Sequence, residues 1–519
     1  MNSNAQDMDA RRTVLFLFLG AVVVRVLLFV MFSDELFVRS DQVEYIRHAR
    51  SFASGDLGGL LDTYWPPFFP FVLGLAYLFS SDLVLPSVAV AVLFGSLAVP
   101  LIYYFVRQSY GHREGLIAGV LAVLYPHLLN SVFDLGSENV YLVLIVLSLV
   151  TGWKAITSDS LLHYALTGGL VGLAYLTRPE AFAYTAFFVA VILFRNIWKK
   201  EHFIKRSLIY CGTFLIAFLV FAMPYLVYLK GEMGRWTISG KTEINTVMGD
   251  YTNPAAADGD RLSNPTLSLR TGADLLRSFS FNMLAINKSL PYLIPLGVMI
   301  FMSLGLFATD WTPTRAKREA YVITFCLLTI VGYAAAVVQT RYFYVLLPVV
   351  FGWMAKGIFA FDKWFHATVK NLGAWERVRT ASRYMPAICI ACMFLYLLPL
   401  NFFVGSREAM WHERPYEERA AGEWLRQNAR PMSTVFSARK APAFYAGATQ
   451  VPPKTTDLDQ VFSEIKTTGV EYVVAGTRGL KRNPYLEGLE ERLQGDGDFE
   501  RVYSRADHPD YKISIYKRK

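Results

Sequence analysis

Two carboxylates spaced one helical turn apart follow the first apolar run of the chain. Asp41 and Glu44 lie in the stretch SDQVEYIRHARSFASGD, residues 40–56, and both would point the same way from a helix. A carboxylate held near an apolar boundary can act as a general base. An ordinary interfacial amphipathic helix with its charges in water has the same spacing, so the pattern alone leaves both interpretations open.

A second acidic pair lies between two later apolar runs. Asp134 and Glu138 are at positions i and i+4, a spacing that could bind a divalent cation or share acid–base chemistry. Helix capping is the alternative, because Ser137 and Glu138 would begin a helix, where an acidic side chain is favourable. For Ser137 we favour capping.

Two arginines mark the ends of other apolar runs. Arg178 stands in LTRPEA near Glu180, and Arg341 stands in QTRYF beside Tyr342. Arginine binds phosphate through two parallel hydrogen bonds, so an arginine at a membrane interface can meet a lipid phosphate. Headgroup anchoring and an Arg178–Glu180 ion pair are the alternatives.

Arg25 differs from these residues because it lies within the first apolar run. An arginine inside the bilayer is energetically unfavourable and generally faces the protein interior with a partner. We expect Arg25 to support a site from within the helix bundle. The sequence does not identify its partner.

The composition predicts a membrane protein. Of the 519 residues, 54% are hydrophobic and 18% are charged, whereas a soluble protein carries about a quarter charged residues. Repeated apolar runs of roughly 20 residues predict a polytopic helical membrane protein. The net charge of +9 comes from Lys and Arg in short loops between the runs, which is typical of membrane orientation and does not indicate nucleic-acid binding.

The apolar runs predict about eleven transmembrane helices. They lie at residues 14–32, 83–106, 114–132, 138–154, 162–177, 181–197, 207–229, 291–308, 320–338, 343–361 and 385–404. A further run, residues 67–79, would cover only about 20 Å as a helix, less than the ~30 Å hydrocarbon core. It begins at Pro66 and Pro67, which suit a helix start, so we predict an interfacial or re-entrant helix there.

The loops between these runs predict the orientation of the chain. With eleven spans and the N-terminus inside, the Lys/Arg-rich loops all lie on the inner side, as the positive-inside rule requires. The outer loops are then about 33–82 and 230–290, and the acids described above reach the outer face together with Arg178 and Arg341. We therefore predict a site at the outer membrane surface. The long polar loop 230–290 is either a lid over this site or partly disordered.

The tail of the chain has a soluble character. Helical patterns at 417–429 and 457–469 alternate with strand patterns at 433–438, 470–476 and 511–518. The predicted organisation is a transmembrane domain over residues 1–405 and a small extracytoplasmic α/β domain over residues 406–519. The predicted fold class is thus an all-α polytopic membrane protein with a small C-terminal soluble α/β domain.

Several motifs, taken in order, resemble a known superfamily. They are SDxxEYxxxAxxxxxGD, YWPPFFPFVLGL, YPHLLNSVFDLGSE, GGLVGLAYLTRPEA and QTRYFYVLLPVV. Their order and spacing resemble the GT-C superfamily of membrane glycosyltransferases over roughly residues 12–360. Within it, the chain resembles the bacterial branch related to protein O-mannosyltransferases and lipid A aminoarabinose transferases.

The resemblance implies a reaction and roles for residues. Such enzymes move a sugar from a polyprenyl-phosphate carrier to an acceptor, with inversion at the anomeric carbon. By position, Asp41 is the expected base, with Glu44 as a further acidic candidate, and Asp134 and Glu138 match the second acidic group. The carrier phosphate is expected to meet Arg178, Arg341 and Tyr342. Supporting roles are expected for Arg25, Tyr45, Pro66, Pro67 and Glu180.

Two departures from the family pattern affect this assignment. Many relatives carry two adjacent acidic residues in the first loop, whereas here Gln42 follows Asp41, which leaves the role of Glu44 open. The proline stretch also lacks the histidine of some protein mannosyltransferases, which weakens the case for a protein acceptor. No cofactor is expected, although a divalent cation could bind at Asp134 and Glu138.

The sequence therefore predicts a glycosyltransferase of the cytoplasmic (inner) membrane. Its expected partners are a polyprenyl-phosphate-linked sugar donor, an envelope acceptor (lipid, glycan or protein) and the lipid bilayer, with no nucleic acid. A transporter or flippase of lipid-linked sugars is the alternative, and another envelope transferase such as an O-antigen ligase is a third. Transporters usually have internal repeats and polar residues at mid-membrane, whereas here the polar set lies at one face.

Overall fold

A computed structural model describes most of the chain in two compact units. The described residues are 3–33, 36–38, 40–199, 203–240, 272–307, 311–335, 338–371, 384–398, 415–430, 432–508 and 510–519. The first unit is helical, and the second contains a small C-terminal sheet. The predicted fold class, a helical membrane protein with a small C-terminal α/β part, is confirmed.

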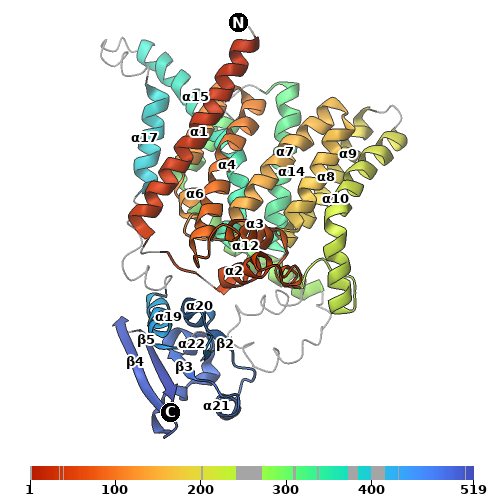
Figure 1. Cartoon of the computed structure of the whole chain (residues 1–519). Coiled ribbons are helices and arrows are strands. Elements are labelled where there is room, and N and C mark those ends of the chain that lie inside the picture. The colour runs from red at the N-terminus through yellow and green to blue at the C-terminus, as the bar shows by residue number, and fades with distance from the viewer. Residues whose placement is uncertain are drawn as a thin grey trace. The chain divides into compact units, whose positions relative to one another are not determined.

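The first unit is a bundle of apolar helices (Figure 1). Its α-helices are α1 (Ser3–Phe32), α3 (Phe68–Tyr77), α4 (Leu85–Tyr110), α5 (His112–Leu124), α6 (Pro126–Asn130), α7 (Glu138–Ser158), α8 (Leu161–Tyr175), α9 (Phe182–Lys199), α10 (Phe203–Met233), α12 (Gly272–Leu293), α13 (Leu296–Phe307), α14 (Pro313–Ala334), α15 (Leu347–Asn371) and α17 (Met385–Leu398). Its 3₁₀ helices are η2 (Gly58–Leu60), η3 (Pro179–Ala181) and η6 (Thr340–Leu346). Helix α2 (Ser40–Ala53) begins in the second unit and ends in the first.

Among the described residues, five helical stretches are long and apolar enough to cross a membrane. They are Ala10–Phe32, Leu85–Tyr110, Glu138–Ser158, Ile204–Met233 and Thr340–Lys370. The pair Phe279–Leu293 and Leu296–Phe307, bent by 92°, could form a sixth. The total of about eleven spans stays a prediction. Helix α3 has ten residues, about 15 Å, so it is shorter than the hydrocarbon core.

Two predicted spans differ from the structure, and proline accounts for both. The run 114–132 is broken into α5 and α6 because Tyr125 precedes Pro126 and takes an extended backbone (φ −70°, ψ 120°). The run 291–308 is broken ahead of α13 at Pro295. Much of the predicted loop 230–290 is also helical, because α12 begins at Gly272; its residues 241–271 lie outside the described part of the chain.

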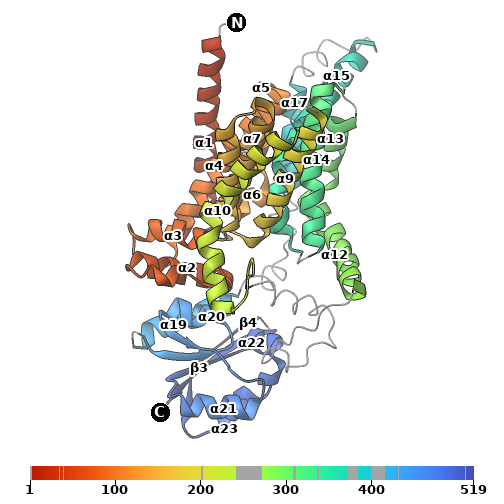
Figure 2. The same ribbon diagram turned by 90° about the vertical axis from the view of Figure 1, so that its right-hand side faces the viewer.

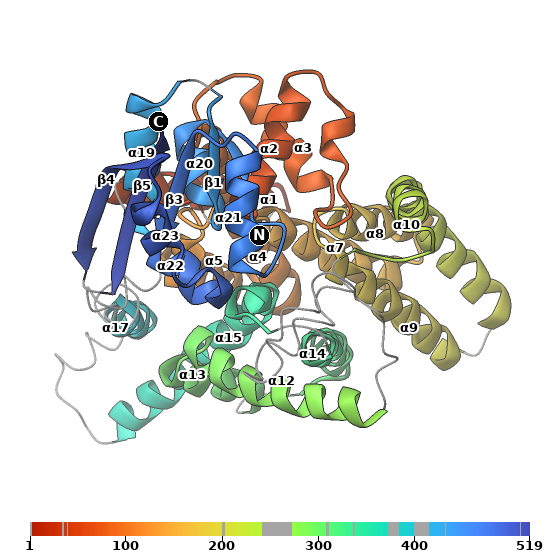
Figure 3. The ribbon, with the colours of Figure 1, turned by 90° about the horizontal axis from the view of Figure 1, so that it is seen from below.

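Helices that are neighbours in sequence are largely neighbours in space. Helix α4 packs against α1, α5 and α7, and Figure 3 shows α7, α8 and α10 side by side. Helices α13 and α15 approach closely at Gly305 and Gly357, where a Cβ would collide with the carbonyl oxygens of Trp353 and Phe301. Small residues at such crossings are typical of membrane helix packing.

A buried carboxylate near the start of α14 joins this helix to α4 and α15. Glu319 of α14 is fully buried and accepts hydrogen bonds from the Tyr110 hydroxyl (2.8 Å) and from Trp353 Nε1 (2.7 Å). Arg315 Nε donates to the same carboxylate at 3.2 Å. A buried charge is tolerated only when it is paired and hydrogen-bonded, and Glu319 meets both conditions.

The second unit contains a five-stranded sheet in the order β2-β1-β3-β5-β4. The strands are β1 (Thr434–Ser437), β2 (Thr449–Val451), β3 (Tyr472–Gly476), β4 (Phe499–His508) and β5 (Tyr511–Arg518). Strands β1, β2 and β3 are parallel, and β5 is antiparallel to β3 and β4. The helices are α19 (Tyr416–Asn428), α20 (Lys440–Ala446), α21 (Leu458–Thr467), α22 (Thr477–Arg482) and α23 (Leu489–Gly495), with the 3₁₀ helix η8 (Pro484–Leu486).

Helices cover both faces of this sheet (Figure 2). On one face Leu425 of α19 packs with Val435 and Ile515, and on the other Val461 of α21 packs with Val473. The helices predicted at 417–429 and 457–469 and the strands predicted at 433–438, 470–476 and 511–518 are all present. The predicted domain boundary near residue 405 lies outside the described residues.

The first prediction concerns the buried Glu319. Glu319→Ala should lower the free energy of unfolding by about 3–5 kcal/mol, because Arg315 and two hydrogen-bond donors would be left buried without their partner. Thermal unfolding of the purified protein in lipid nanodiscs measures this. Glu232→Ala, at an exposed position near the end of α10, is the control, and an equal loss in both variants would contradict the assignment.

Candidate active site

The structure brings together three of the residues that the sequence singled out. Glu138 is the first residue of α7, and its Oε1 accepts a hydrogen bond from Arg178 Nη1 at 2.9 Å. The same oxygen lies 3.4 Å from Arg341 Nε. Glu138 and Arg178 are both buried, whereas Arg341 is partly exposed. Three segments of the first unit thus meet at the Glu138 carboxylate. We call the four residues Glu138, Arg178, Arg341 and Glu180 the Glu138 cluster.

Aromatic rings and a second acid complete the surroundings of Arg178. Its Nη2 lies 3.6 Å from Glu180 Oε1, and its guanidinium lies 4.4 Å from the centre of the Tyr342 ring. The Arg178 guanidinium also lies 5.6 Å from the centre of the Tyr141 ring. Contacts of this kind stabilise a cation that has lost its water. The Arg178–Glu180 ion pair predicted as an alternative is therefore present, together with the pair to Glu138.

Local sequence explains how Arg178 enters the bundle. Pro179 restricts the preceding residue to an extended backbone, and Arg178 has φ −149° and ψ 126°. This ends the helical stretch at α8 and turns the chain into η3, in which Pro179 takes the first position. At the other arginine, Gln339 is extended before η6 begins, and its side-chain Oε1 accepts from Arg341 Nε at 2.8 Å.

The Glu138 cluster has balanced charge and a spare acceptor. Its two carboxylates and two guanidinium groups sum to a formal charge of zero. Glu138 Oε2 is buried and makes no hydrogen bond among the described residues, so one acceptor faces the interior. Guanidinium groups bind phosphate oxygens with fixed geometry, and Arg341 is the more accessible of the two arginines.

A divalent cation at the second acidic pair stays a prediction. The described ion pairs of Glu138 are with Arg178 and Arg341, and both involve Oε1, which leaves Oε2 outside these pairs. Asp134 is half-buried beside Leu135, whose backbone is left-handed (φ 37°). Within the described residues, no group of three or more His, Cys, Asp or Glu side chains is placed to hold a metal ion. Ser137 occupies the N-cap position of α7 and Glu138 opens the helix, as predicted, but the Ser137 side chain makes no capping hydrogen bond.

Asp41 and Glu44 lie on the part of α2 that belongs to the second unit. Asp41 is half-buried. Glu44 accepts from Arg47 Nε at 2.8 Å and from Lys440 Nζ at 2.5 Å. Burial raises the pKa of Glu44, but Lys440 and Arg47 outweigh burial and hold that pKa below its usual value. Glu44 is therefore an ion-paired carboxylate with little exposure, and not a charge facing water.

The other half of α2 belongs to the first unit, where His48 holds it. His48 is buried, and its Nδ1 donates to the Gly59 carbonyl at 2.5 Å while Nε2 lies 3.5 Å from Asp62 Oδ2. Sequence analysis did not single out His48 or Asp62 as site residues. Asp62 accepts hydrogen bonds from backbone N–H groups two and three residues further along the chain. Aspartate commonly makes such bonds in turns, so a turn pattern in the sequence could have identified Asp62.

Asp62 and the two prolines after it shape the loop that leads to α3. Asp62 Oδ1 accepts from the backbone N–H groups of Tyr64 (2.7 Å) and Trp65 (3.0 Å). Tyr225 of α10 donates its hydroxyl to the Asp62 carbonyl at 2.9 Å. Pro66 is buried, and α3 begins directly after Pro67.

Two residues that were expected to support the site are buried. Tyr45 is 6% exposed, on the second-unit part of α2. Arg25 is fully buried, and its Nη1 donates to the Ala21 carbonyl at 3.3 Å. A Cβ at Gly95 would lie 3.0 Å from Arg25 Nε and 3.5 Å from the Asn139 side chain, so Arg25 packs beside the residue that follows Glu138. None of the described carboxylates forms an ion pair with Arg25.

The chain is similar to known proteins both in sequence and in structure. Residues 65–228 match the family described as dolichyl-phosphate-mannose-protein mannosyltransferase. The structure is similar to ArnT from Cupriavidus metallidurans bound to undecaprenyl phosphate, with a TM-score of 0.56, 13% identity and coverage of 99% of this chain and 98% of that one. The chain has the GT-C fold.

Archaeal structures share this GT-C fold. The oligosaccharyltransferase AglB from Archaeoglobus fulgidus, in complex with an inhibitory peptide and a dolichol-phosphate, gives a TM-score of 0.54 at 12% identity, over 99% of this chain and 74% of that one. An Archaeoglobus fulgidus oligosaccharyltransferase complexed with Zn and sulfate gives 0.56 at 14% identity, over 90% and 68%. Comparison with curated protein sequences gives no match.

These comparisons confirm the resemblance that the motifs predicted. The GT-C fold, the family match and the apolar helices support an integral membrane protein with the fold of glycosyltransferases. The matched region begins at Trp65 and ends within α10, so it includes Pro66, Pro67, Glu138, Arg178 and Glu180 but not Arg341.

The second prediction concerns Asp62. Burial raises the pKa of this carboxyl, but the hydrogen bonds from His48 and from the Trp65 and Tyr64 N–H groups outweigh burial and lower the pKa to about 2. Because the folded pKa lies below the ordinary value of 3.8, the stabilisation is complete above about pH 4 and is lost as the pH falls through about 2.

Asp62→Ala should therefore lower the free energy of unfolding by about 1–3 kcal/mol at neutral pH, with a smaller difference from wild type near pH 2. Thermal unfolding across pH measures this. Asp82→Ala is a matched control, because Asp82 also accepts from two backbone N–H groups (Val84, 2.9 Å; Leu85, 2.7 Å) but is exposed. A difference that grows as the pH falls would contradict the role given to the Asp62 carboxylate.

Proposed function

We propose that this protein is an inverting glycosyltransferase that moves a sugar from a polyprenyl-phosphate carrier to an acceptor of the cell envelope. The observation that carries the proposal is the arrangement of the buried Glu138 and Arg178 with the partly exposed Arg341 within a GT-C fold. ArnT, which shares that fold, is described with undecaprenyl phosphate bound and AglB with a dolichol-phosphate, and the matched family is described as dolichyl-phosphate-mannose-protein mannosyltransferase.

The arginines supply the chemistry that the leaving group needs. When the bond between the anomeric carbon and the phosphate oxygen breaks, negative charge develops on the phosphate. Guanidinium groups held in place beforehand stabilise that charge without reorganising at the moment of reaction. Glu138 keeps Arg178 oriented, and Tyr342 lies against the guanidinium, so both residues preserve this arrangement.

Asp41 is assigned as the general base. It takes the proton of the acceptor hydroxyl while the acceptor oxygen forms a bond to the anomeric carbon from the face opposite the phosphate, which inverts the configuration. Glu44 is held by Lys440 and Arg47, so we assign it to positioning and not to proton transfer. Asp134 remains a candidate member of the second acidic group, and Arg25 and Pro66 remain supporting residues.

The orientation of the chain follows from the distribution of its charges. Lys and Arg concentrate in the loops predicted to be inside. The proposal therefore places the reaction and the C-terminal domain on the extracytoplasmic side of the cytoplasmic membrane, with a lipid, a glycan or a protein of the envelope as acceptor.

The third prediction is that Asp41→Asn abolishes transfer. A general base contributes about 10²- to 10⁴-fold in rate, so kcat should fall at least about 100-fold while donor binding is kept. The measurement is transfer of label from a radiolabelled polyprenyl-phosphate-sugar to total envelope acceptors in proteoliposomes. The control is Asp56→Asn, at an exposed aspartate in the same predicted outer loop.

Each outcome of this assay decides between functions. Label that reaches a lipid, glycan or protein fraction with wild type, and not with Asp41→Asn, supports the proposal and identifies the class of acceptor. Full activity of the variant would remove Asp41 as the base. If no carrier gives transfer and the protein instead moves lipid-linked sugar across vesicle membranes, the protein is a flippase.

The fourth prediction is that Arg178→Ala weakens donor binding. Loss of a charged hydrogen-bonding partner of a phosphate should raise the donor KM about 10- to 100-fold, whereas the acceptor KM should change little. Arg195→Ala removes another ion-paired arginine at a helix end and should leave the donor KM as in wild type. An unchanged donor KM in Arg178→Ala would indicate a purely structural ion pair.

A further inference from the structure

The first half of α2 is held by the C-terminal domain. Residues 36–38 and 40–47 belong to the same compact unit as residues 415–519, although nearly 400 positions separate them in sequence. The contacts come from α19 and from α20, the helices that cover one face of the sheet. This segment includes Asp41, so what fixes the segment also fixes the proposed base.

The backbone ahead of α2 is tied to α19 and α20. The N–H group of Val38, a fully buried residue, donates to the Tyr445 hydroxyl at 2.8 Å. Arg419 Nη1 donates to the Leu36 carbonyl at 3.3 Å. The Phe37 ring packs edge-on against Tyr416, with centres 4.7 Å apart.

One ion pair reaches α2 itself. Lys440, the first residue of α20, places Nζ 2.5 Å from Glu44 Oε1, and the Glu44 side chain is 13% exposed. Arg47 holds the other oxygen at 2.8 Å. The Glu44 carboxylate is thus fixed from the C-terminal domain on one oxygen and from its own helix on the other.

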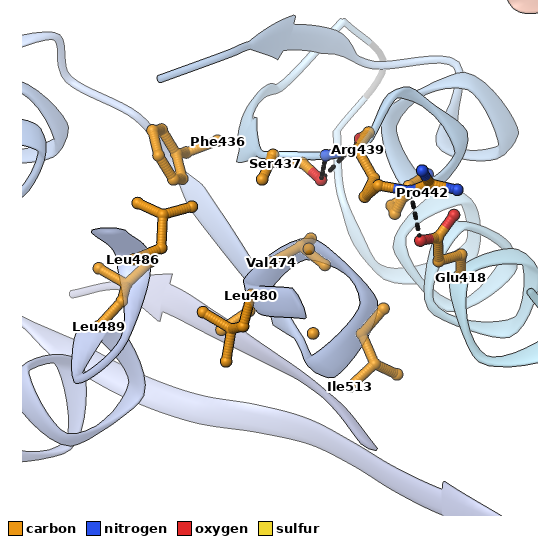
Figure 4. A pocket seen from close by; sticks show the side chains of 14 residues that line it. Glu418, Phe436, Ser437, Arg439, Pro442, Val474, Leu480, Leu486, Leu489 and Ile513 are labelled. Carbon is orange, nitrogen blue, oxygen red and sulfur yellow. Dashed lines mark hydrogen bonds and ion pairs between the residues drawn. The ribbon is translucent and has the colours of Figure 1, made fainter. Parts of the chain in front are cut away.

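Contacts within the C-terminal domain hold Lys440 in place. The preceding residue, Arg439, donates from Nε to Glu418 Oε1 at 2.9 Å, and Glu418 is 3% exposed in the first turn of α19 (Figure 4). Gly422 lets the two helices approach, since a Cβ there would lie 2.7 Å from the Pro442 carbonyl. Together these contacts fix the start of α20, and with it Lys440, against α19.

The spacing within α2 connects this ion pair to the proposed base. Residues three apart in a helix lie on the same face, with Cβ atoms roughly 5–6 Å apart, so the setting of Glu44 determines where Asp41 points. The second half of α2 is fixed separately, through His48. Rotation of the first half of α2 about its axis would break the ion pair between Lys440 and Glu44.

We infer that Lys440 of the C-terminal domain is a positioning residue that aims Asp41 through Glu44. The inference rests on the proposed function. In this inference the C-terminal domain affects the reaction although none of its side chains contacts the substrate. The domain sets the rotation of the helix that presents the base.

The fifth prediction tests this inference in the full-length protein. Lys440→Met removes the charge and keeps an apolar side chain, and it should lower kcat about 10- to 100-fold with the donor KM unchanged, because misplacing a base affects the chemical step. Lys440→Arg should restore most of the activity. Lys454→Met is the matched control, since Lys454 also pairs with a glutamate of this domain (Glu464, 3.6 Å) but lies away from residues 36–47.

A second readout does not depend on activity. Hydrogen–deuterium exchange of residues 38–47 should rise in Lys440→Met and in Tyr445→Phe, which removes the acceptor of the Val38 N–H group, and should stay at the wild-type level in Lys454→Met. Peptides from β1 and β3 should be unchanged, which shows that the domain is folded.

The two readouts separate this inference from the proposed function. If wild type transfers no sugar but exchange rises as expected, the contact is real and the proposed function is wrong. If wild type transfers sugar and Lys440→Met keeps full kcat, the positioning role is wrong. A fall in kcat that Lys440→Arg does not restore would also overturn it.

Discussion

The site in the first unit depends on keeping Arg178 charged and buried. Removing a guanidinium from water is strongly unfavourable unless a carboxylate and further donors or rings replace the solvent. Glu138, Glu180 and the rings of Tyr141 and Tyr342 take that place. Since these groups come from different segments, the charge requirement holds together the start of α7, the α8–η3 link and η6.

Prolines set the geometry that lets these segments meet. Pro179 ends the helical stretch of α8 and turns Arg178 inward, and Pro126 breaks the preceding apolar run shortly before α7 begins. Each break releases backbone from a helix near a predicted outer boundary, where side chains can reach both protein and lipid headgroups. A fold of straight, unbroken helices would offer fewer such positions.

Helix α2 contributes residues to each of the two units. His48 and the Asp62 loop hold one half in the first unit, and Lys440 and Tyr445 hold the other half in the second. Under the proposed function, the C-terminal domain would influence the reaction by orienting the helix segment that carries Asp41, without supplying a catalytic group of its own.

The sequence by itself determined the membrane class, the position of most apolar helices, five elements of the C-terminal domain and the residues of the Glu138 cluster. These depend on local periodicity, proline and charge, which short windows contain. Only the tertiary structure decided that Glu138 pairs with Arg178 and Arg341, that Asp62 fixes His48, and that Glu44 meets Lys440, 396 positions away. Such pairings arise from helix packing and chain topology, which the spacing of residues along the chain does not determine.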